Sequence, residues 1–419
     1  MTQNLEINSE QINQMTKIST KEREFRIKNL KLFKETGFPS KRYEDWKFSD
    51  FREIVENNFE ELDATEISSK IKKINLIKDF EHNYIFLING NLDSSNFKYE
   101  EKSKIKLSPI NNNIEYQIIK NPLICLNHAL AKNGYTLEIS KNYKFKKSLV
   151  VYNFFTEDLK NKFLNSKNFI KVNENSEVHI IEYTINESKF KFINNVYENI
   201  ILEKNAKCRN LHIQNNKSEG FFHKYLKSKL YNNSDYSNFI FSSGLRFNKI
   251  DIECDLMQKN SKCNILSGIF LNNNEHQEIK TLINHFAPNC LSYQRVKKVL
   301  SADSKGVYQG KIYVKNLAQK TDAYQLSKAL LLNDSSEFNS KPELEIYADD
   351  VKCSHGSTSG SIDEDSLYYL MSRGLKKDNA AKLLIKGFLN DVVEFIKSNS
   401  IKSFVQSKIE EHVNGHRAD

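Results

Sequence analysis

Alternation of apolar and polar residues dominates the chain from about residue 145 to Cys353. Such alternation puts successive side chains on opposite faces and predicts half-buried β-strands. The stretches between the alternating runs are rich in Asn and Ser, whereas the whole chain contains only 5 Pro. The pattern therefore predicts a long β region, which we place at residues 146–360.

A short turn motif recurs along this region. It begins at Asn175, Asn205, Asn233 and Asn260, at offsets of 30, 28 and 27 residues, and each copy leads into an alternating strand. Asn tolerates the left-handed backbone conformation that tight turns need. A regular period of strands without intervening helices predicts a stacked β-solenoid, because each turn of the chain buries its inward face against the next. A β-sandwich would instead have strands spaced by roughly 8–12 residues without this recurring turn.

Helical patterns appear at both ends of the chain. The run at 19–22 (Ser-Thr-Lys-Glu) is a capping box, and the helix after it is expected to stop at Gly37. Beyond Gly360 we expect two helices, the first opened by a capping box at 361–364 and the second beginning near Asp378. The predicted domains are an N-terminal helical or mixed module at 1–145, the β region at 146–360 and a C-terminal helical domain at 361–419.

Five apolar residues of the C-terminal helices form a candidate partner-binding surface: Leu367, Leu370, Leu384, Phe388 and Val392. Apolar residues at helical spacing usually face a core. A two-helix appendage has little core of its own, however, so part of this stripe is expected to be a docking face.

Composition narrows the functional classes. The net charge of +9 comes from 62 Lys and Arg scattered among 53 Asp and Glu, and no nucleic-acid-binding motif accompanies it, so we expect no nucleic-acid partner. No apolar run approaches the roughly 20 residues of a membrane helix. Residues 1–6 lack the order of a signal peptide, and we therefore expect a cytoplasmic protein with reduced thiols.

Two of the six cysteines are predicted to be core residues. Cys208 and Cys263 occupy the positions in the repeat that Val178 and Tyr236 hold in neighbouring copies. Because a free cysteine behaves as a small apolar residue, both are expected to point inward and to be inert. The roles of the remaining thiols Cys254 and Cys290 stay open.

Cys353 and His355 are the candidate chemical site. They lie two residues apart in a predicted strand, so both side chains can emerge on one face, just before a Gly/Ser/Thr loop at 356–360. A thiolate and an imidazole bind soft or borderline metals, but two ligands do not complete a site. The neighbouring Asp349 and Asp350 are not paired carboxylates for acid–base catalysis, because adjacent strand residues face opposite ways.

No self-contained catalyst is visible in the sequence. The run from Gly306 to Lys311 has one residue too few between its glycines for a phosphate loop, and Ile312 stands where Ser or Thr should hold magnesium. It also leads into a strand rather than a helix. We therefore expect a protein that is not an enzyme.

The segment around Cys353 resembles a known family. Residues 345–356 (Glu-Ile-Tyr-Ala-Asp-Asp-Val-Lys-Cys-Ser-His-Gly) and 369–374 (Tyr-Leu-Met-Ser-Arg-Gly) are similar to a signature of the SufB/SufD family. Residues 310–314 and 319–325 and the run at 44–48 (Glu-Asp-Trp-Lys-Phe) are similar to the same family. The resemblance spans nearly the whole chain, and it is strongest from 305 to 390 and weak from 50 to 140. Its Cys-Ser-His segment resembles the SufD branch rather than the SufB branch.

The resemblance implies a mainly β protein with helical ends, whose core is a right-handed parallel β-helix. It implies a non-catalytic scaffold subunit for iron–sulfur cluster assembly that pairs with a SufB-like paralogue and binds a SufC-like ATPase. Cys353 would be a thiolate ligand or sulfur handler and His355 an iron ligand for a transient cluster or iron at the subunit interface, with none held stably by the isolated chain.

Several alternatives stay open beside this reading. The isolated chain could form a homodimer, and the complex could hold a reduced flavin. Two alternatives to the scaffold function are a purely structural interaction protein and a carbohydrate-active β-solenoid enzyme.

Overall fold

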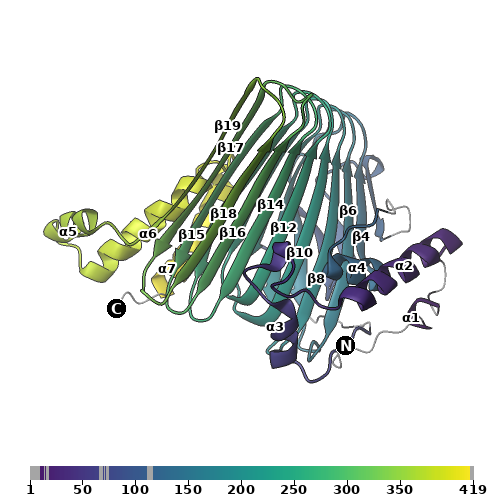
Figure 1. Cartoon of the computed structure of the whole chain (residues 1–419), viewed down its shortest axis with the longest axis horizontal. Coiled ribbons are helices and arrows are strands. Elements are labelled where there is room, and N and C mark those ends of the chain that lie inside the picture. The colour runs from purple at the N-terminus through teal and green to yellow at the C-terminus, as the bar shows by residue number, and fades with distance from the viewer. Residues whose placement is uncertain are drawn as a thin grey trace.

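The structure is a computed structural model that describes residues 10–13, 15, 18–65, 69, 71, 75–110 and 117–415. Residues 1–6, on which the expectation about a signal peptide rests, lie outside this described part. The centre of the molecule is the predicted parallel β-solenoid, in which two large sheets face each other (Figure 1). From β5 to β19 successive strands alternate between the two sheets, so each pair of strands completes one rung.

The first sheet has ten strands in the order β19-β17-β15-β13-β11-β9-β7-β5-β1-β2. Their bounds are β1 His82–Ile88, β2 Asn91–Asn96, β5 Ser148–Phe155, β7 Glu177–Asn186, β9 Lys207–Gln214, β11 Asp235–Ser242, β13 Lys262–Leu271, β15 Leu291–Leu300, β17 Thr321–Leu331 and β19 Val351–Gly360. All neighbours pair in parallel except β1 and β2, which are antiparallel.

The second sheet has nine strands in the order β18-β16-β14-β12-β10-β8-β6-β4-β3. Their bounds are β3 Ile105–Pro109, β4 Asn133–Ile139, β6 Phe163–Val172, β8 Ile193–Leu202, β10 Ser218–Leu230, β12 Leu245–Leu256, β14 His276–His285, β16 Lys305–Val314 and β18 Glu337–Ile346. Strands β1 to β4, which lie before residue 146, therefore continue the two sheets of the solenoid.

The turn motif has the conformation that the sequence predicts. Asn175, Asn205, Asn233 and Asn260 have φ values of 58°, 59°, 57° and 60°, all in the left-handed region. Their side chains also form a ladder along the solenoid, in which each Nδ2 donates to the Oδ1 of the preceding rung, over 2.7 Å for Asn205 to Asn175 and 3.1 Å for Asn233 to Asn205. The ladder begins one rung earlier, at Asn142.

The interior between the sheets is filled largely by apolar side chains, and it contains the two cysteines expected there. Cys208 is 0% and Cys263 is 1% exposed, and both belong to the interior apolar cluster. Cys254 and Cys290, which the sequence left open, are also fully buried in this cluster.

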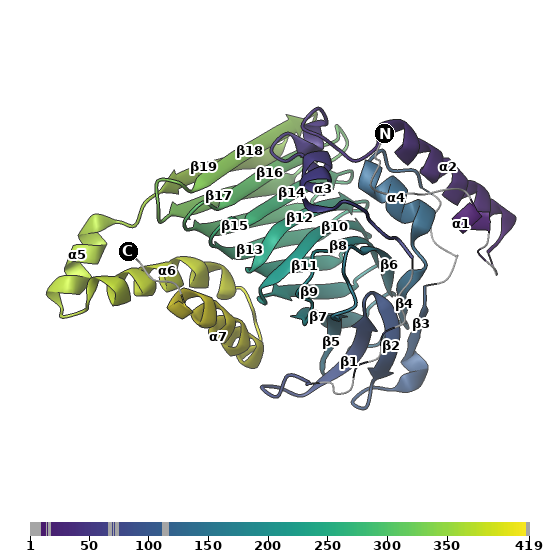
Figure 2. The same ribbon diagram turned by 90° about the horizontal axis from the view of Figure 1, so that it is seen from below.

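N-terminal helices cover the outer face of the second sheet (Figure 2). They are α1 Glu10–Asn13, α2 Thr20–Thr36, the 3₁₀ turn η1 Glu44–Trp46, α3 Phe51–Asn58 and α4 Pro122–Leu130. A second 3₁₀ turn, η2 Lys102–Lys104, directly precedes β3. Ser19 caps α2 by accepting a hydrogen bond from the Glu22 amide at 3.2 Å, and Gly37 ends the helix with φ 66°, both as predicted.

Three helices follow β19: α5 Glu364–Ser372, α6 Lys377–Val393 and α7 Asn399–Gly415. Of these, α6 and α7 cover the outer face of the first sheet. The third helix was not predicted, and α6 and α7 together bury their apolar faces against Phe239, Leu266 and other outward residues of the sheet. Helix α5 contains no buried residue and projects from the body of the protein (Figures 1 and 2). Its N-cap is Asp363, which accepts from the Ser366 amide, rather than Ser361.

The prediction of a loop at the Gly/Ser/Thr run 356–360 was wrong, because these residues belong to β19. It stays extended because each residue pairs in register with β17, out to Leu330 opposite Gly360. Backbone hydrogen bonding to a formed sheet outweighs the low strand propensity of these residues.

Within the described part of the chain, no helix combines the length and the apolar composition that crossing a membrane requires.

Candidate functional site

Cys353 and His355 lie on β19, the last strand of the first sheet. Their register partners on β17 are Ala323 and Gln325, which are 1% and 0% exposed inside the solenoid. Because strand residues two apart share a face, Cys353 and His355 continue this inward-facing row. No further rung covers them, so Cys353 is half-buried and His355 is exposed.

The environment of Cys353 favours the protonated thiol over the thiolate. Partial burial, followed by the negative charge of Asp322, raises its pKa above the usual value, and a hydrogen bond from the Ala323 backbone only partly opposes this. A thiol must lose its proton to bind a metal. The surroundings of Cys353 therefore disfavour the thiolate, the form that binds a metal.

Cys353 and His355 are two potential metal ligands on one strand. Among the described residues, no group of three or more His, Cys, Asp or Glu side chains lies close enough together to hold a metal ion. The next inward residue of β19, Ser357, instead accepts a hydrogen bond from Ser327 at 2.9 Å. Cys353 and His355 therefore stay a predicted pair of ligands, which we call the half-site.

The half-site lies on an open end of the solenoid. Strands β18 and β19 are the terminal strands of their sheets, and each pairs with a neighbour on one side only. Ile346 and Tyr347, beside this edge, are 37% and 60% exposed. An uncovered strand edge with apolar residues is a template for pairing with another chain.

The predicted docking residues separate into two groups. Val392 is completely buried against the first sheet, while Leu384 and Phe388 on the same helix are half-buried. Leu367 and Leu370 are half-buried on the projecting helix α5. The stripe therefore does not form one continuous exposed surface.

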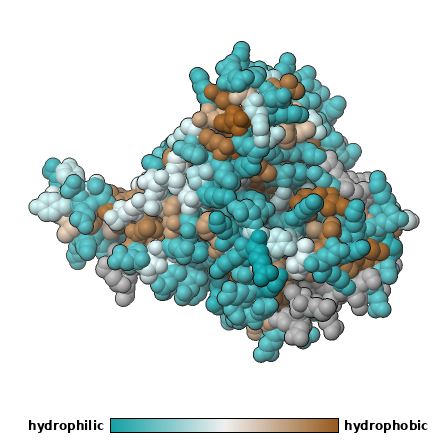
Figure 3. Space-filling model, viewed as in Figure 1, coloured by the Kyte–Doolittle hydropathy of each residue, from teal (hydrophilic) through white to brown (hydrophobic). Residues whose placement is uncertain are grey.

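A groove lies between α5 and the end of the solenoid. Its volume is about 690 Å³, and its lining includes Leu332, Ile362, three residues of α5 (Leu367, Tyr368 and Met371) and two of α6 (Ala381 and Ile385). Tyr368 and Met371 are 74% and 41% exposed. Figure 3 shows apolar atoms among hydrophilic ones on the C-terminal helices at the left of the molecule.

The segment Glu44-Asp45-Trp46 fastens the N-terminal module to the second sheet. Trp46 is 1% exposed and anchors the module, and the Lys249 ammonium lies 4.8 Å from its ring centre. Glu44 pairs with Lys341 on β18, and Asp45 pairs with Lys280 on β14. Glu44, Asp45 and Trp46 therefore attach the N-terminal module to strands of several rungs.

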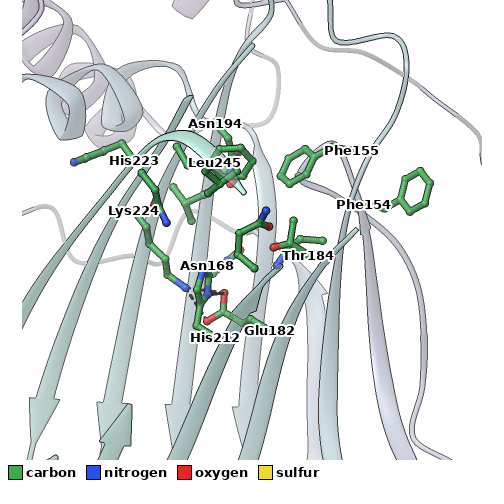
Figure 4. Close-up of a pocket in the computed structure, with 17 residues that line it drawn as sticks. Phe154, Phe155, Asn168, Glu182, Thr184, Asn194, His212, His223, Lys224 and Leu245 are labelled. Carbon is green, nitrogen blue, oxygen red and sulfur yellow. Dashed lines mark hydrogen bonds and ion pairs between the residues drawn. The ribbon is translucent and has the colours of Figure 1, made fainter. Parts of the chain in front are cut away.

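Sequence reasoning missed a charged cluster inside the solenoid. Glu182, Glu198 and Lys224 project inward from β7, β8 and β10, and His212 from β9 lies beside them. Figure 4 shows Lys224, Glu182 and His212 converging, whereas His223 points the other way. The available signal was a charged residue at an inward position of three alternating strands, although the alternation does not show which inward side chains meet.

Comparisons with known proteins place the half-site in a recognised domain. Residues 154–388 match the family model described as SUF system FeS cluster assembly, SufBD core domain. The chain is similar to the iron–sulfur cluster assembly protein SufD of Escherichia coli K12, with 24% identity over 394 residues that cover 92% of each chain.

Two further relatives match over shorter stretches. Protein ABCI7, chloroplastic, of Arabidopsis thaliana is 28% identical over 250 residues, which cover 58% of this chain and 52% of that protein. An iron–sulfur cluster assembly SufBD family protein of Synechocystis is 28% identical over 211 residues, covering 50% of this chain and 47% of its own length.

Proposed function

This chain belongs to the SufBD family of the SUF system for iron–sulfur cluster assembly, and on that premise we propose that it is a non-catalytic scaffold subunit of an assembly complex. Its partners are a SufB-like paralogue at the open end of the solenoid and a SufC-like ATPase at the C-terminal helices. The proposed location is the cytoplasm.

The observation that carries the proposal is the half-site on the last rung. Cys353 and His355 present a thiol and an imidazole at an uncovered strand edge. A pair of this kind binds iron weakly, since water fills the other coordination positions and the thiol must release its proton. Ligands from a partner across the edge complete the site, so an assembling cluster or an iron ion is held between the subunits as cargo.

The open edges support pairing with a paralogue. A SufB-like solenoid that adds its own last strands to β18 and β19 satisfies their unpaired backbone groups and covers Tyr347. The same contact brings partner side chains next to His355. In the absence of the paralogue, a second copy of this chain is the alternative occupant.

The projecting helix α5 and its groove support docking of the ATPase. Leu367 and Leu370, with the exposed Tyr368 and Met371, offer apolar area that this chain does not bury. Val392 is excluded from this surface because it is part of the core. Deleting residues 361–419 would also uncover the first sheet, so substitutions on α5 test docking more cleanly than the deletion does.

A non-catalytic role is supported by the strand conformation of residues 306–311, which lie within β16 and cannot wrap a phosphate. We therefore assign ATP turnover to the ATPase. A glycosidase would need a pair of carboxylates on one face. Glu253 and Asp255 of β12 are one outward pair, but Lys227 contacts both, at 2.9 and 3.9 Å. That pairing favours a structural role for them.

The proposal is tested with His355→Ala in the complex with a SufB-like subunit and a SufC-like ATPase. Iron and acid-labile sulfide are measured after anaerobic reconstitution, with Ser354→Ala as the control because Ser354 faces outward on the same strand. We expect His355→Ala to assemble normally and to hold less iron and sulfide, while Ser354→Ala matches the wild type. Equal iron in all three intact complexes would mean that His355 is structural.

A further inference from the structure

A buried ion cluster lies inside the solenoid, away from the half-site. The Lys224 ammonium donates to both carboxylate oxygens of Glu182 at 2.7 Å and lies 3.2 Å from Oε1 of Glu198. His212 Nδ1 is 3.5 Å from Glu182 Oε2. Glu198 is 0%, Glu182 4% and Lys224 8% exposed. Two carboxylates therefore share one ammonium in a region shielded from solvent.

A small polar cavity adjoins the cluster (Figure 4). Its volume of about 40 Å³ is bounded by Glu182, His212 and Lys224 on one side and by Asn168 and Gln214 among other polar residues. Asn168 and Gln214 are 6% and 1% exposed, yet Asn168 Oδ1 and Gln214 Oε1 have no hydrogen-bond partner in the protein.

The two unpaired oxygens identify what fills the cavity. A buried acceptor without a donor costs about 1–3 kcal/mol, so a dry cavity with two of them is unfavourable. A volume of 40 Å³ admits roughly three water molecules, at about 10–15 Å³ each. Water can donate to both amide oxygens and still accept from, or donate to, the charged groups beside them.

The charges indicate that the cluster also binds a proton. Burial, and then the negative charge of Glu182, raises the pKa of Glu198 above its usual 4.5. Burial opposes the ionisation of Glu182 as well, but the charges and hydrogen bonds of Lys224 and His212 bring its pKa below the usual value. The other titratable groups facing Glu198 are Tyr135, Cys208 and Tyr236, whose pKa values burial raises, so they stay neutral and offer no compensating charge.

We propose that this cavity is an internal hydration and proton-binding site, in which bound water links the Lys224 cluster and Glu198 takes up one proton. On uptake an O–H bond forms on the Glu198 carboxylate, and on release the proton passes to cavity water and then to solvent. The site is independent of the proposed scaffold function and of Cys353 and His355.

Infrared difference spectra of the folded protein, recorded between about pH 5 and about pH 8, test the proton. We expect the carbonyl stretch of a protonated carboxylic acid to disappear as the pH rises and this change to be reduced in Glu198→Gln. Glu275→Gln is the control, because burial raises the pKa of Glu275 to about 7 and it contributes its own band. A Glu198→Gln spectrum identical to that of the wild type, with circular dichroism showing both folded, would overturn the assignment.

The stability of the same variants gives a second readout. A raised folded-state pKa contributes stability that is complete below the usual value of 4.5 and is lost as the pH rises. The unfolding constant of the wild type should therefore increase more steeply with pH than that of Glu198→Gln, by up to about tenfold per pH unit for one proton. Equal slopes would contradict proton binding at Glu198.

Xenon tests the hydration. Apolar cavities stay dry and bind xenon, whereas a hydrated polar cavity of this size does not. We expect xenon-pressurised crystals of the full chain to show ordered water, and no xenon, between Asn168 and Gln214. Xenon at that position would refute the hydration site.

Discussion

Replacing Val392 by alanine decides whether α6 serves as a core helix or as a docking helix. Val392 is completely buried and lies over the bare backbone of Gly268 in β13, where an added Cβ would come within 3.2 Å of Val392 Cγ2. The substitution removes two methyl groups, worth about 0.8 kcal/mol each. The void left between α6 and β13 adds a cavity cost, so we expect the free energy of unfolding to fall by about 2–3 kcal/mol.

The assay combines denaturant unfolding with capture of the ATPase at a temperature where each variant is folded. Val392→Ala should lose stability and keep the ATPase. The matched control, Leu370→Ala on α5, should keep most of its stability and lose the ATPase, because no residue of α5 is buried in this chain. A Val392→Ala protein of wild-type stability that fails to capture the ATPase would refute the reasoning.

A double-mutant cycle with Gly268→Ala checks the contact itself. The new methyl group should strain wild-type packing, because Val392 Cγ2 occupies its space. In the Val392→Ala background that space is free, so the same substitution should refill part of the void. We expect a coupling free energy of about 1 kcal/mol, and additive effects would place the two residues out of contact.

Two further predictions concern the solenoid. Cys208→Ser should lower the free energy of unfolding by about 1–3 kcal/mol, because the new hydroxyl is buried with poor hydrogen bonding. Cluster assembly should persist in the folded complex. Unchanged stability together with lost assembly would mean that this thiol belongs to the functional site. Asn205→Ala should destabilise more than Asn205→Gly, by about 1 kcal/mol in denaturant unfolding, because only glycine adopts the left-handed conformation freely. Equal losses in the two variants would mean that the side-chain ladder, rather than the backbone conformation, dominates at this turn.

Local signals in the sequence were sufficient for the architecture of the solenoid. The Asn repeat predicted left-handed turns, and the alternation around it predicted which residues face inward, including Cys208 and Cys263. Ser19 and Gly37 likewise marked the two ends of α2. Each of these features depends on one residue and its immediate neighbours in the chain, through φ preference, capping or the two-residue period of a strand.

Local signals were insufficient where the outcome depended on a neighbour distant in sequence. From sequence alone, the run at 356–360 was predicted to be a loop, but it pairs with β17. Val392 was predicted to be a docking residue, but it packs on the first sheet beneath α6. The half-site itself stays a prediction from sequence, although the structure adds its position at an uncovered strand edge.

The sequence alone therefore determined the β-solenoid, its turns and its inward-facing rows, because the two-residue period of a strand depends only on consecutive residues. Only the tertiary structure decided which faces the terminal helices cover and that Glu182, Glu198 and Lys224 meet in the interior. Those contacts join residues 42 apart for Lys224 and Glu182. They form because β7 of the first sheet faces β8 and β10 of the second across the interior, and no local pattern shows which inward side chains meet there.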